Sequence, residues 1–488
     1  MKASIPKKIL ETVGILIEKG YEAFVVGGCV RDLLIEKKPK DWDIATNAKP
    51  EDLEKIFPKT FYNNSYGTVT VVWEEEQDES LKKIEITPFR QESSYSDKRH
   101  PDKVIFSGNI EDDLSRRDFT INAIAYEINK RQFIDPFKGQ NDLKDKIIRS
   151  VGNSKKRFSE DALRLIRAVR FATILNFSIE EETFTSIKKM ALLIDKIAIE
   201  RIRDEFSKII LSDNPKRGIE LLDESNLLKY IVPELRTGIG IEQNEAHAYD
   251  VWEHTLRTVQ HAANRNWSFH VRLAALFHDI AKPETRRWSN EKNNWTFYGH
   301  DVVGSRVTES VLKKLKYPKE TIEIVSKLVR FHLFFSDVDK ITMSAVRRLI
   351  RNVGKEHIWE LMNVRACDRI GTGRPKEAPY RLRKFESMIE EALRDPISVS
   401  MLKIDGNKLM KVTREKPGPK IGAVLSVLLE EVLEDPQKNN EKYLEDKALV
   451  LSKMSFNELR ALSENAKKKS SEIEEGNIKD IRKKHWVQ

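Results

Sequence analysis

The fold of the N-terminal region is decided at Phe24-Val25-Val26-Gly27-Gly28-Cys29-Val30-Arg31-Asp32-Leu33 and, shortly after it, at Asp41-Trp42-Asp43. The first segment is typical of a buried strand that ends in a glycine pair and continues into a short helix. The second segment places two carboxylates at positions i and i+2, which on an extended chain point to the same face. Two convergent carboxylates beside a glycine turn are the groups that a Mg²⁺-dependent phosphoryl-transfer site needs. Nucleotidyl transfer is therefore the working hypothesis for this region.

Composition excludes several classes of protein. A chain of 488 residues predicts two to four domains, and a hydrophobic content of 40% suffices for packed cores. No apolar run approaches the roughly 18 residues that a membrane span requires, and the N-terminus lacks an apolar signal core. Cys29 and Cys367 are the only cysteines, which argues against a disulfide framework or a cysteine-rich zinc site. We expect a cytoplasmic protein with no membrane partner, and the oligomeric state stays open.

The net charge of +9 permits a polyanionic partner without requiring one. The basic residues form local clusters, for example Lys98-Arg99-His100 and Arg347-Arg348 with Arg351. A solvated surface is the default interpretation of any single cluster of this kind.

Strand patterns concentrate in the first 150 residues. They cover 25–27, 40–44, 68–73 and 83–87, the last two forming a predicted hairpin. Helices are expected over about Pro6–Lys19 and from Pro50, where proline and acidic residues occupy the first turn. Beyond about Asp142 helical periodicity takes over, with breaks expected near 150, 236–248 and 390–398.

Four motifs carry a family resemblance. They are Val26-Gly27-Gly28-Cys29-Val30-Arg31-Asp32, Asp41-Trp42-Asp43, Arg116-Arg117-Asp118-Phe119-Thr120-Ile121-Asn122-Ala123 and Glu160-Asp161-Ala162-Leu163-Arg164-Leu165-Ile166-Arg167-Ala168-Val169-Arg170-Phe171-Ala172. In this order, over residues 20–235, the chain resembles the class II tRNA nucleotidyltransferase and bacterial poly(A) polymerase family. Family-like sequence continues to about residue 450.

The resemblance assigns roles to the matching positions. Asp41 and Asp43 are the implied catalytic residues and Mg²⁺ ligands, which activate a 3′-hydroxyl and neutralise the leaving pyrophosphate. The implied nucleotide-binding residues are Gly28, Arg31, Arg117, Asp118, Asp161, Arg164, Arg167 and Arg170. Glu85 is either a third carboxylate of the site or a solvent-facing strand residue, and both interpretations stay open.

Within that set, Arg117 and Asp118 are implied to contact the ribose. Asp161 and Arg164 are expected one turn apart on a helix beginning near Ser159, where the family reads the Watson–Crick edge of CTP and then ATP. Successive i+3 steps drift by about 60° on a helix, so Arg170 is expected to point away from Asp161. We interpret it as a phosphate-side or structural residue.

Two segments bear on the product. Poly(A) polymerases of the family typically show a glycine–double-basic–phenylalanine segment, which is absent where this chain has Ile86-Thr87-Pro88-Phe89-Arg90-Gln91-Glu92. Tyr95-Ser96-Asp97-Lys98-Arg99-His100-Pro101 resembles the family's flexible loop, which enzymes that stop after two cytidines lack. Both features favour full CCA addition, although enzymes that add only the final adenosine share every motif.

The helical region contains a second set of candidate residues. They are His254, His278, Asp279, His300, His332 and Asp368. Phe277-His278-Asp279-Ile280-Ala281-Lys282 resembles the HD family of metal-dependent phosphohydrolases, whose histidine and aspartate ligands bind divalent metals. The resemblance implies a second divalent transition metal, Mn²⁺ or Ni²⁺, and hydrolysis of phosphomonoesters or 2′,3′-cyclic phosphates. Some relatives keep this fold with a dead site, so an inactive centre stays open as well.

Together these resemblances imply an α+β fold with a small mixed-sheet head and all-α regions after it. The expected parts are a nucleotidyltransferase catalytic head (1–150), a helical neck with the base-reading helix (151–240), an HD-like helical body (241–395), a helical tRNA-binding tail (396–464) and a charged flexible tail (465–488). In the tRNA-binding tail, Ile404–Met410 and Lys416–Gly422 resemble the tRNA-contacting end of these enzymes, although an ordinary helix hairpin fits the local pattern equally.

The leading functional prediction is template-independent addition of C, C and A to tRNA 3′ ends from CTP and ATP, by two-metal transfer with release of pyrophosphate. Addition of adenosine alone, or of a poly(A) tail, stays open within the same class. From a different class, the alternative is an HD phosphohydrolase with a degenerate head. A non-catalytic RNA-binding protein would leave the carboxylates and base-reading residues without a task.

Overall fold

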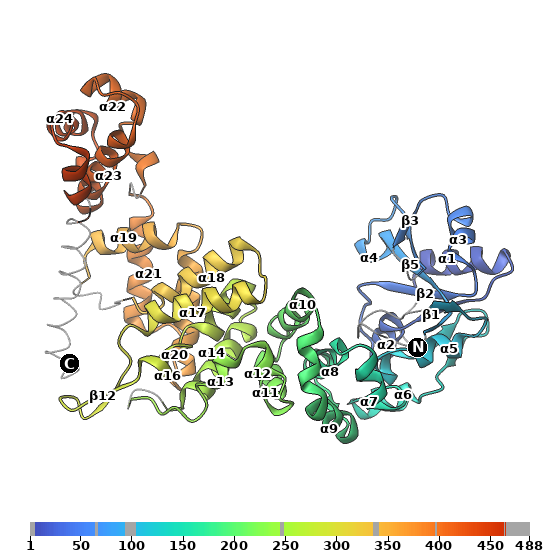
Figure 1. Ribbon diagram of the computed structural model, residues 1–488. Helices are drawn as coiled ribbons and strands as arrows, with labels where there is room; N and C mark the ends of the chain where they lie inside the picture. The colour runs from blue at the N-terminus through green and yellow to red at the C-terminus, as the bar shows by residue number, and fades with distance from the viewer. Residues whose placement is uncertain are drawn as a thin grey trace. The chain divides into compact units, whose positions relative to one another are not determined.

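The computed structural model describes residues 5–63, 67–92, 104–244, 248–334, 341–395, 398–462 and 464 (Figure 1). The chain forms two compact units that divide at Arg236 and Thr237, with the short segment 314–316 grouped with the first. The loop predicted at 95–101 and the tail predicted at 465–488 lie outside the described residues.

The first unit begins with a seven-stranded mixed sheet in the order β3-β4-β5-β2-β1-β8-β9. Its strands are β1 (Ala23–Val26), β2 (Trp42–Thr46), β3 (Thr60–Asn63), β4 (Thr68–Val72), β5 (Lys83–Pro88), β8 (Ala125–Glu127) and β9 (Gln132–Ile134). Only the β2–β5 pair is parallel among these strands. The antiparallel β4–β5 pair confirms the predicted hairpin. The sequence missed β3, β8 and β9, which have only three or four residues each and thus little periodicity.

Short helices surround this sheet. They are α1 (Lys7–Glu18), α2 (Gly28–Leu34), α3 (Pro50–Ile56), α4 (Glu79–Lys82), α5 (Ile110–Ser115), the 3₁₀ turn η1 (Thr120–Asn122) and α6 (Gly139–Asp145). Two further strand pairs are antiparallel β6 (Arg90–Glu92) with β7 (Val104–Phe106) and parallel β10 (Ile147–Ile148) with β11 (Ser178–Ile179).

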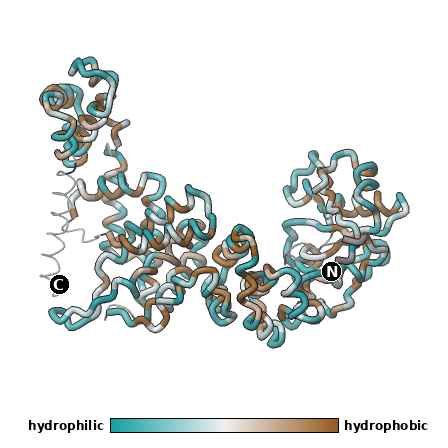
Figure 2. Tube along the Cα trace, in the orientation of Figure 1, coloured by the Kyte–Doolittle hydropathy of each residue, from teal (hydrophilic) through white to brown (hydrophobic). Residues whose placement is uncertain are grey.

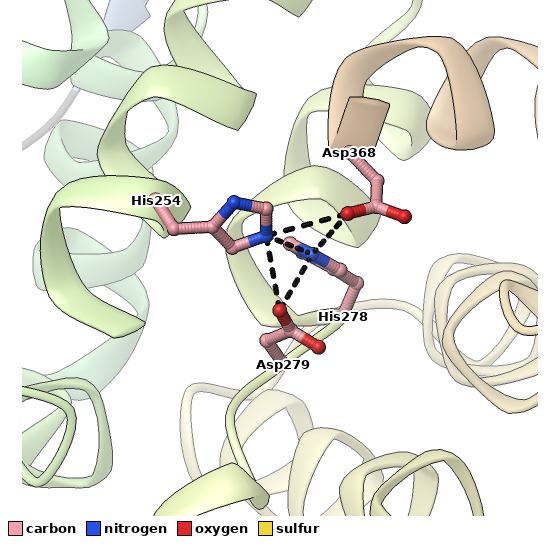
Figure 3. Close-up of side chains that lie close together, drawn as sticks. All are labelled: His254, His278, Asp279 and Asp368. Atoms are coloured by element: carbon pink, nitrogen blue, oxygen red, sulfur yellow. Dashed lines mark hydrogen bonds and ion pairs between the residues drawn. The ribbon is translucent and has the colours of Figure 1, made fainter. Parts of the chain in front are cut away.

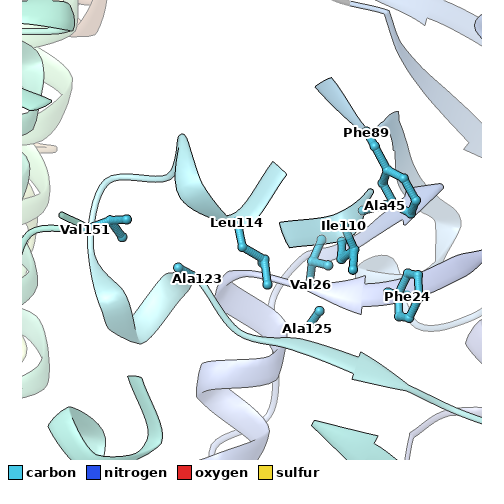
Figure 4. Close-up of a cluster of buried hydrophobic side chains, with 9 residues drawn as sticks. All are labelled: Phe24, Val26, Ala45, Phe89, Ile110, Leu114, Ala123, Ala125 and Val151. Atoms are coloured by element: carbon cyan, nitrogen blue, oxygen red, sulfur yellow. The ribbon is translucent and has the colours of Figure 1, made fainter. Parts of the chain in front are cut away.

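One face of the sheet is covered by α5, whose Ile110 and Leu114 are one turn apart. Figure 4 shows the resulting cluster of buried side chains, which comprises Phe24, Val26, Ala45, Phe89, Ile110, Leu114, Ala123, Ala125 and Val151. Phe24 and Val26 share this face because side chains alternate along β1. The strand ends that carry the candidate carboxylates are therefore anchored by a packed core.

Helices complete the first unit. They are α7 (Ser154–Glu160), α8 (Leu163–Leu175), α9 (Glu181–Met190), η2 (Ala191–Lys196), α10 (Ile199–Ile210), α11 (Pro215–Glu224), α12 (Leu228–Ile231) and α13 (Pro233–Arg236). The long helix α8 is the centre of this group, since α7, α10 and α11 all pack against it.

The second unit is helical apart from one hairpin among its described residues. Its helices are α14 (Val251–Asn264), α15 (Phe269–Phe277), α16 (Lys282–Thr285), α17 (His300–Lys314), α18 (Lys319–Phe331), α19 (Met343–Val353), α20 (Ile358–Gly371), α21 (Tyr380–Ala392), η3 (Val399–Met401), α22 (Gly406–Thr413), α23 (Pro419–Glu434), η4 (Pro436–Lys438) and α24 (Glu441–Leu451). The hairpin consists of β12 (Arg287–Ser289) and β13 (Asn294–Thr296). Figure 2 shows hydrophobic and hydrophilic residues alternating along these helices, as expected where each helix buries one face.

This arrangement confirms the predicted α+β class, with a small mixed sheet at the head followed by helical regions. The finer domain boundaries at 150, 395 and 464 remain predictions. Within the part of the chain that the structure describes, no helix is both long and apolar enough to cross a membrane.

Candidate active site and metal centre

Three carboxylates gather at the end of the sheet face covered by α5. Asp43 on β2 is in register with Val26 of β1 and with Glu85 of the parallel strand β5. Asp41 lies just before β2, and its charge acts on Asp43. Asp41 and Glu85 are exposed and Asp43 is half-buried, which leaves the group open to a ligand.

The electrostatics of this group favour a bound cation. Burial raises the pKa of Asp43 to about 6, and the charges of Glu85 and Asp41 add to the rise, while Arg117 opposes it. Like charges this close disfavour one another's ionised form, and a divalent cation with oxygen ligands would relieve that repulsion. The donor set therefore fits the predicted Mg²⁺.

The glycine pair makes a tight turn beside these carboxylates. Gly27 has φ +78° at the start of α2, and a Cβ there would lie 2.5 Å from Nη1 of Arg117 and 3.5 Å from Oδ2 of Asp43. A Cβ on Gly28 would meet only Nη2 of Arg31, at 3.7 Å. The turn therefore requires a glycine at position 27. Gly28, and not Gly27, was the predicted site residue.

Arg117 is held in place by a buried acid that the sequence did not single out. Asp113 on α5 is fully buried, and its Oδ2 accepts hydrogen bonds from Nη2 of Arg117 at 3.0 Å and from Nε at 3.2 Å. Arg116 donates from Nε to the other oxygen at 2.9 Å. The i+3 and i+4 spacing of the two arginines from Asp113 is the signal that would have identified it.

A second buried network connects the head to α8. Oδ2 of Asp118 accepts from Nε of Arg167 at 2.9 Å, and its Oδ1 accepts from the Asn122 side chain at 3.1 Å. Nη1 of Arg31 donates to Oδ1 of Asn122 at 2.7 Å. Burial alone would raise the pKa of Asp118, but Arg167 and Asn122 outweigh it and hold that pKa well below its usual range. The structure thus brings Arg31, Asp118 and Arg167 together through Asn122, which the sequence analysis did not identify.

The predicted base-reading pair is placed differently from the expectation. The prediction of a single helix beginning near Ser159 is wrong, because α7 ends at Glu160 and α8 begins at Leu163. Asp161 lies in the break between them, where its Oδ1 accepts from the Leu163 amide at 3.0 Å and its Oδ2 from Arg201 at 3.1 Å. The Asp161 carboxylate thereby satisfies the first backbone amide of α8, which has no partner within the helix.

The guanidinium of Arg164 is held by three partners of its own. Its buried guanidinium donates to the carbonyl oxygen of Arg116 at 2.9 Å, to that of Arg157 at 3.1 Å and to the carboxylate of Glu160 at 3.1 Å. Arg170, further along α8, pairs with Glu205 of α10 at 2.9 Å and stacks over Phe171. Burial lowers the pKa of Arg170 to about 10, with Arg167 adding to the effect.

In the second unit the predicted histidines and aspartates converge from separate segments. His254 is on α14, His278 and Asp279 follow α15, His300 opens α17, His332 follows α18 and Asp368 is on α20. All six side chains are buried. They form two overlapping groups suited to metal binding, His254-His278-Asp279-Asp368 (Figure 3) and Asp279-His300-His332.

Asp279 is common to both groups because its two oxygens face different histidines. Oδ2 lies 3.0 Å from Nε2 of His254 and 3.1 Å from Nε2 of His278. Oδ1 lies 3.2 Å from Nε2 of His300 and 3.8 Å from Nε2 of His332. One carboxylate placed between two sets of imidazole nitrogens is the arrangement that suits a pair of divalent ions.

The histidine rings are oriented by the backbone. Nδ1 of His278 bonds the carbonyl of Ala275 at 2.9 Å, Nδ1 of His300 that of Phe297 at 2.5 Å, and Nδ1 of His332 that of Val329 at 2.7 Å. Since a carbonyl only accepts, each of these Nδ1 atoms carries a proton, and Nε2 is the ring nitrogen that faces the centre. Among the described residues, Nε2 of His300 and Nε2 of His332 are buried without a hydrogen-bond partner. These nitrogens and carboxylates fit a transition metal.

One further group contacts the centre. The ammonium of Lys282 lies 2.7 Å from Oδ2 of Asp279 and donates to Oε1 of Gln243 at 2.5 Å. Burial favours protonated Asp279, but His278 and Lys282 outweigh it and lower its pKa well below the usual range. Lys282 was not among the predicted site residues, although its i+3 spacing from Asp279 was a signal for it. No local sequence pattern indicated that Gln243 would be its partner.

Three family models match the chain. They are described as the poly A polymerase head domain (residues 23–149), a probable RNA and SrmB-binding site of polymerase A (176–238) and the HD domain (251–371). The last range includes all six residues of the metal centre.

Named relatives match over different lengths. The CCA-adding enzyme of Ligilactobacillus salivarius (strain UCC118) is 48% identical over 225 residues, an alignment that covers 46% of this chain and 54% of the relative. The match to this relative thus spans about half of its length. The CCA-adding enzyme of Lactobacillus helveticus (strain DPC 4571) is 33% identical over 447 residues, which covers 90% of this chain and 96% of that one.

Solved structures agree with the fold. The structure of the Bacillus stearothermophilus CCA-adding enzyme in complex with CTP matches with a TM-score of 0.68 and 26% identity, and covers 91% of this chain and 98% of that one. The Thermotoga maritima CCA-adding enzyme complexed with tRNA matches with a TM-score of 0.54 and 21% identity over 91% of this chain and 96% of that one, and indicates likeness of fold.

Proposed function

This chain belongs to the family of CCA-adding enzymes, and we propose that it adds C, C and A to the 3′ ends of tRNA from CTP and ATP. The observation that carries the proposal is the placement of Asp43 in register with Glu85 and within the electrostatic reach of Asp41, beside the Gly27 turn and Arg117. A non-catalytic role would leave an unbalanced group of carboxylates at the end of a packed sheet.

Asp43 and Asp41 are the proposed holders of Mg²⁺, and their register with Glu85 makes that residue the third candidate ligand. Bound Mg²⁺ would lower the pKa of the attacking 3′-hydroxyl and neutralise charge on the departing pyrophosphate. Arg117 is fixed by Asp113 against the glycine turn, where its guanidinium can contact the incoming nucleotide. Because Asp113 supports it on one side, this arginine is ordered before a nucleotide arrives.

Base selection is proposed for Asp161 and Arg164. Arg201 orients the carboxylate of Asp161, and backbone carbonyls orient Arg164, so both have defined positions without a nucleic-acid template. Between them they offer acceptors and donors for the Watson–Crick edge of C or A. The absence of the poly(A)-type segment at 86–92 favours the CCA product over a long A tail.

Incubation of a tRNA that ends before CCA with labelled CTP, ATP or both tests this function. We expect two C and one A from the wild type, and nothing from Asp41→Ala/Asp43→Ala. The matched control is Glu51→Ala/Glu54→Ala, which removes two exposed carboxylates from α3 and should leave addition unchanged. Addition of A alone, or of a long A tail, would contradict the CCA assignment.

A second activity is favoured by the shared position of Asp279 and by the two unpartnered histidine nitrogens. We propose that this centre binds divalent transition metal, Mn²⁺ or Ni²⁺, and hydrolyses phosphorylated RNA ends. In hydrolysis of a 2′,3′-cyclic phosphate, the oxygen of water bonds to phosphorus and one P–O ring bond breaks, with a proton passing to the freed hydroxyl. The metal would supply Lewis-acid activation of water. Protein purified without transition metal, and inactive as a phosphatase after Mn²⁺ or Ni²⁺ is added, would overturn the proposal.

A further inference from the structure

The β12–β13 hairpin exposes aromatic side chains beside the metal centre. Trp288 is 49% exposed and Tyr298, which directly follows the hairpin, is 55% exposed. Trp288 is in register with Trp295, and their ring centroids lie 5.1 Å apart at an interplanar angle of 79°. Large aromatic rings left in solvent on a small projecting element (Figure 1) are a common feature of surfaces that bind a partner.

Cations accompany these rings. The guanidinium of Arg286 lies 3.7 Å from the ring centroid of Trp295, and the ammonium of Lys292 lies 5.0 Å from that of Tyr298. Arg287 is exposed and donates only to nearby backbone carbonyls in the described structure. Residues 282–298 contain four lysines and arginines against two glutamates, so the element carries net positive charge. Figure 2 shows the projecting turn as mainly hydrophilic.

The base of the hairpin is part of the metal centre. Phe297 follows β13, and its carbonyl accepts from Nδ1 of the ligand candidate His300. Its ring centroid lies 5.6 Å from the ammonium of Lys282, which contacts Asp279. The hairpin and the metal centre are therefore adjacent in the fold.

We propose that the β12–β13 hairpin binds the single-stranded end of an RNA whose terminal phosphate enters the metal centre. In this arrangement the rings of Trp288 and Tyr298 stack on bases, and Arg287 contacts a backbone phosphate. Aromatic stacking combined with positive charge fits a single strand, because a duplex hides the faces of its bases. The inference rests on the phosphohydrolase function proposed above and assigns its substrate side.

The test compares Trp288→Ala/Tyr298→Ala with the wild type on two substrates in the Mn²⁺-loaded full-length protein. For an oligonucleotide that ends in a 2′,3′-cyclic phosphate, we expect KM to rise roughly 10-fold to 100-fold. For 2′,3′-cyclic AMP, a single nucleotide that lacks the rest of the strand, kcat and KM should stay unchanged. Trp288→Phe/Tyr298→Phe should restore most of the affinity, and Tyr380→Ala, an exposed aromatic on α21, is the matched control.

Direct binding separates this inference from the phosphohydrolase proposal. Fluorescence anisotropy with a labelled single-stranded oligonucleotide that ends in a 3′-phosphate measures affinity whether or not hydrolysis occurs. Weaker binding by the double alanine variant supports the hairpin even if neither substrate is hydrolysed, an outcome that would overturn only the hydrolytic function. Equal binding by the variant and the wild type would overturn the hairpin proposal, as would equal affinity for a fully paired duplex.

Discussion

The two candidate sites hold their carboxylates in opposite ways. Asp41, Asp43 and Glu85 lie at the open end of a sheet, and two of the three are exposed. The metal-centre residues lie inside a helical unit and are all buried. The first arrangement leaves the carboxylates open to a charged nucleotide, while the second preforms a compact cluster of nitrogen and oxygen ligands.

Asp43 and Asp279 also differ in the charges that surround them. Burial and neighbouring acids raise the pKa of Asp43 to about 6, whereas His278 and Lys282 hold the pKa of Asp279 well below its usual range. Asp43 thus lacks full charge compensation within the protein, and Asp279 already has it from cationic neighbours. The comparison indicates that the carboxylates of the head depend on incoming cations for charge balance more than Asp279 does.

The largest effect is expected from Asp43→Asn. The substitution keeps the shape of the side chain but removes a charge that the proposed metal needs, so nucleotide incorporation should fall by about 10³-fold or more. The measurement is a single-turnover assay with labelled CTP, and metal analysis should show the second unit unchanged. Near-normal incorporation would mean that the open carboxylates are not the catalytic group.

Asp279→Asn is the corresponding change in the buried centre. Because one side chain faces both groups of histidines, we expect a loss of bound Mn²⁺ or Ni²⁺ and a fall in hydrolysis of about 100-fold, with CCA addition retained. Elemental analysis after dialysis measures the metal directly. Glu309→Gln, which alters a carboxylate paired with Lys313 on α17, is the control and should keep its metal.

The substitution Asp118→Asn tests a carboxylate of the head that, like Asp279, is paired with a cationic side chain. Loss of the buried pair with Arg167 should reduce the free energy of unfolding of the first unit by about 2–3 kcal/mol at pH 7. The folded pKa of Asp118 lies below its unfolded value of about 3.9, so this stabilisation is present above pH 4 and is lost as pH falls further. Urea titrations at pH 7 and at pH 3 should show the difference between variant and wild type shrinking at the lower pH. A constant difference would assign the stabilisation to packing.

The smallest effect is expected at the glycine turn. Gly27→Ala places a methyl group against Arg117 at a positive φ, and we expect a loss of about 1–2 kcal/mol in the stability of β1 and β2. Gly28→Ala, where the new methyl group has space, is the matched control for stability. Hydrogen exchange of the β1 and β2 amides measures both variants. Equal protection in the two would show that the turn can shift to accept a side chain.

Predictions made from a local cluster of basic residues were less dependable than predictions made from the periodic pattern of a strand. The default interpretation of Arg347-Arg348 with Arg351 as a solvated surface is wrong. Arg347 is buried and donates to the carbonyl of Leu433 at 2.7 Å and to Asp395 at 2.8 Å. Arg351 pairs with Glu430 at 2.6 Å. These partners lie 48 to 86 residues away, so no local pattern could identify them.

The sequence by itself determined the features that depend on short-range geometry. The strand that ends at the glycine pair, the i and i+2 spacing of Asp41 and Asp43, and the β4–β5 hairpin follow from a period of two and from the conformational freedom of glycine. The metal-binding set was predicted through the resemblance of Phe277–Lys282 to the HD family, because a single histidine in a helical pattern carries no such signal.

Only the tertiary structure decided which groups share a partner. Asn122 joins Arg31 to Asp118 across 91 residues, and Gln243 reaches Lys282 across 39. The division of the two oxygens of Asp279 between separate sets of histidines likewise exists only once four helical segments have packed together. The physical reason is that a hydrogen bond or ligand contact is specified within about 0.5 Å, a precision set by the packing of distant elements and not by spacing along the chain.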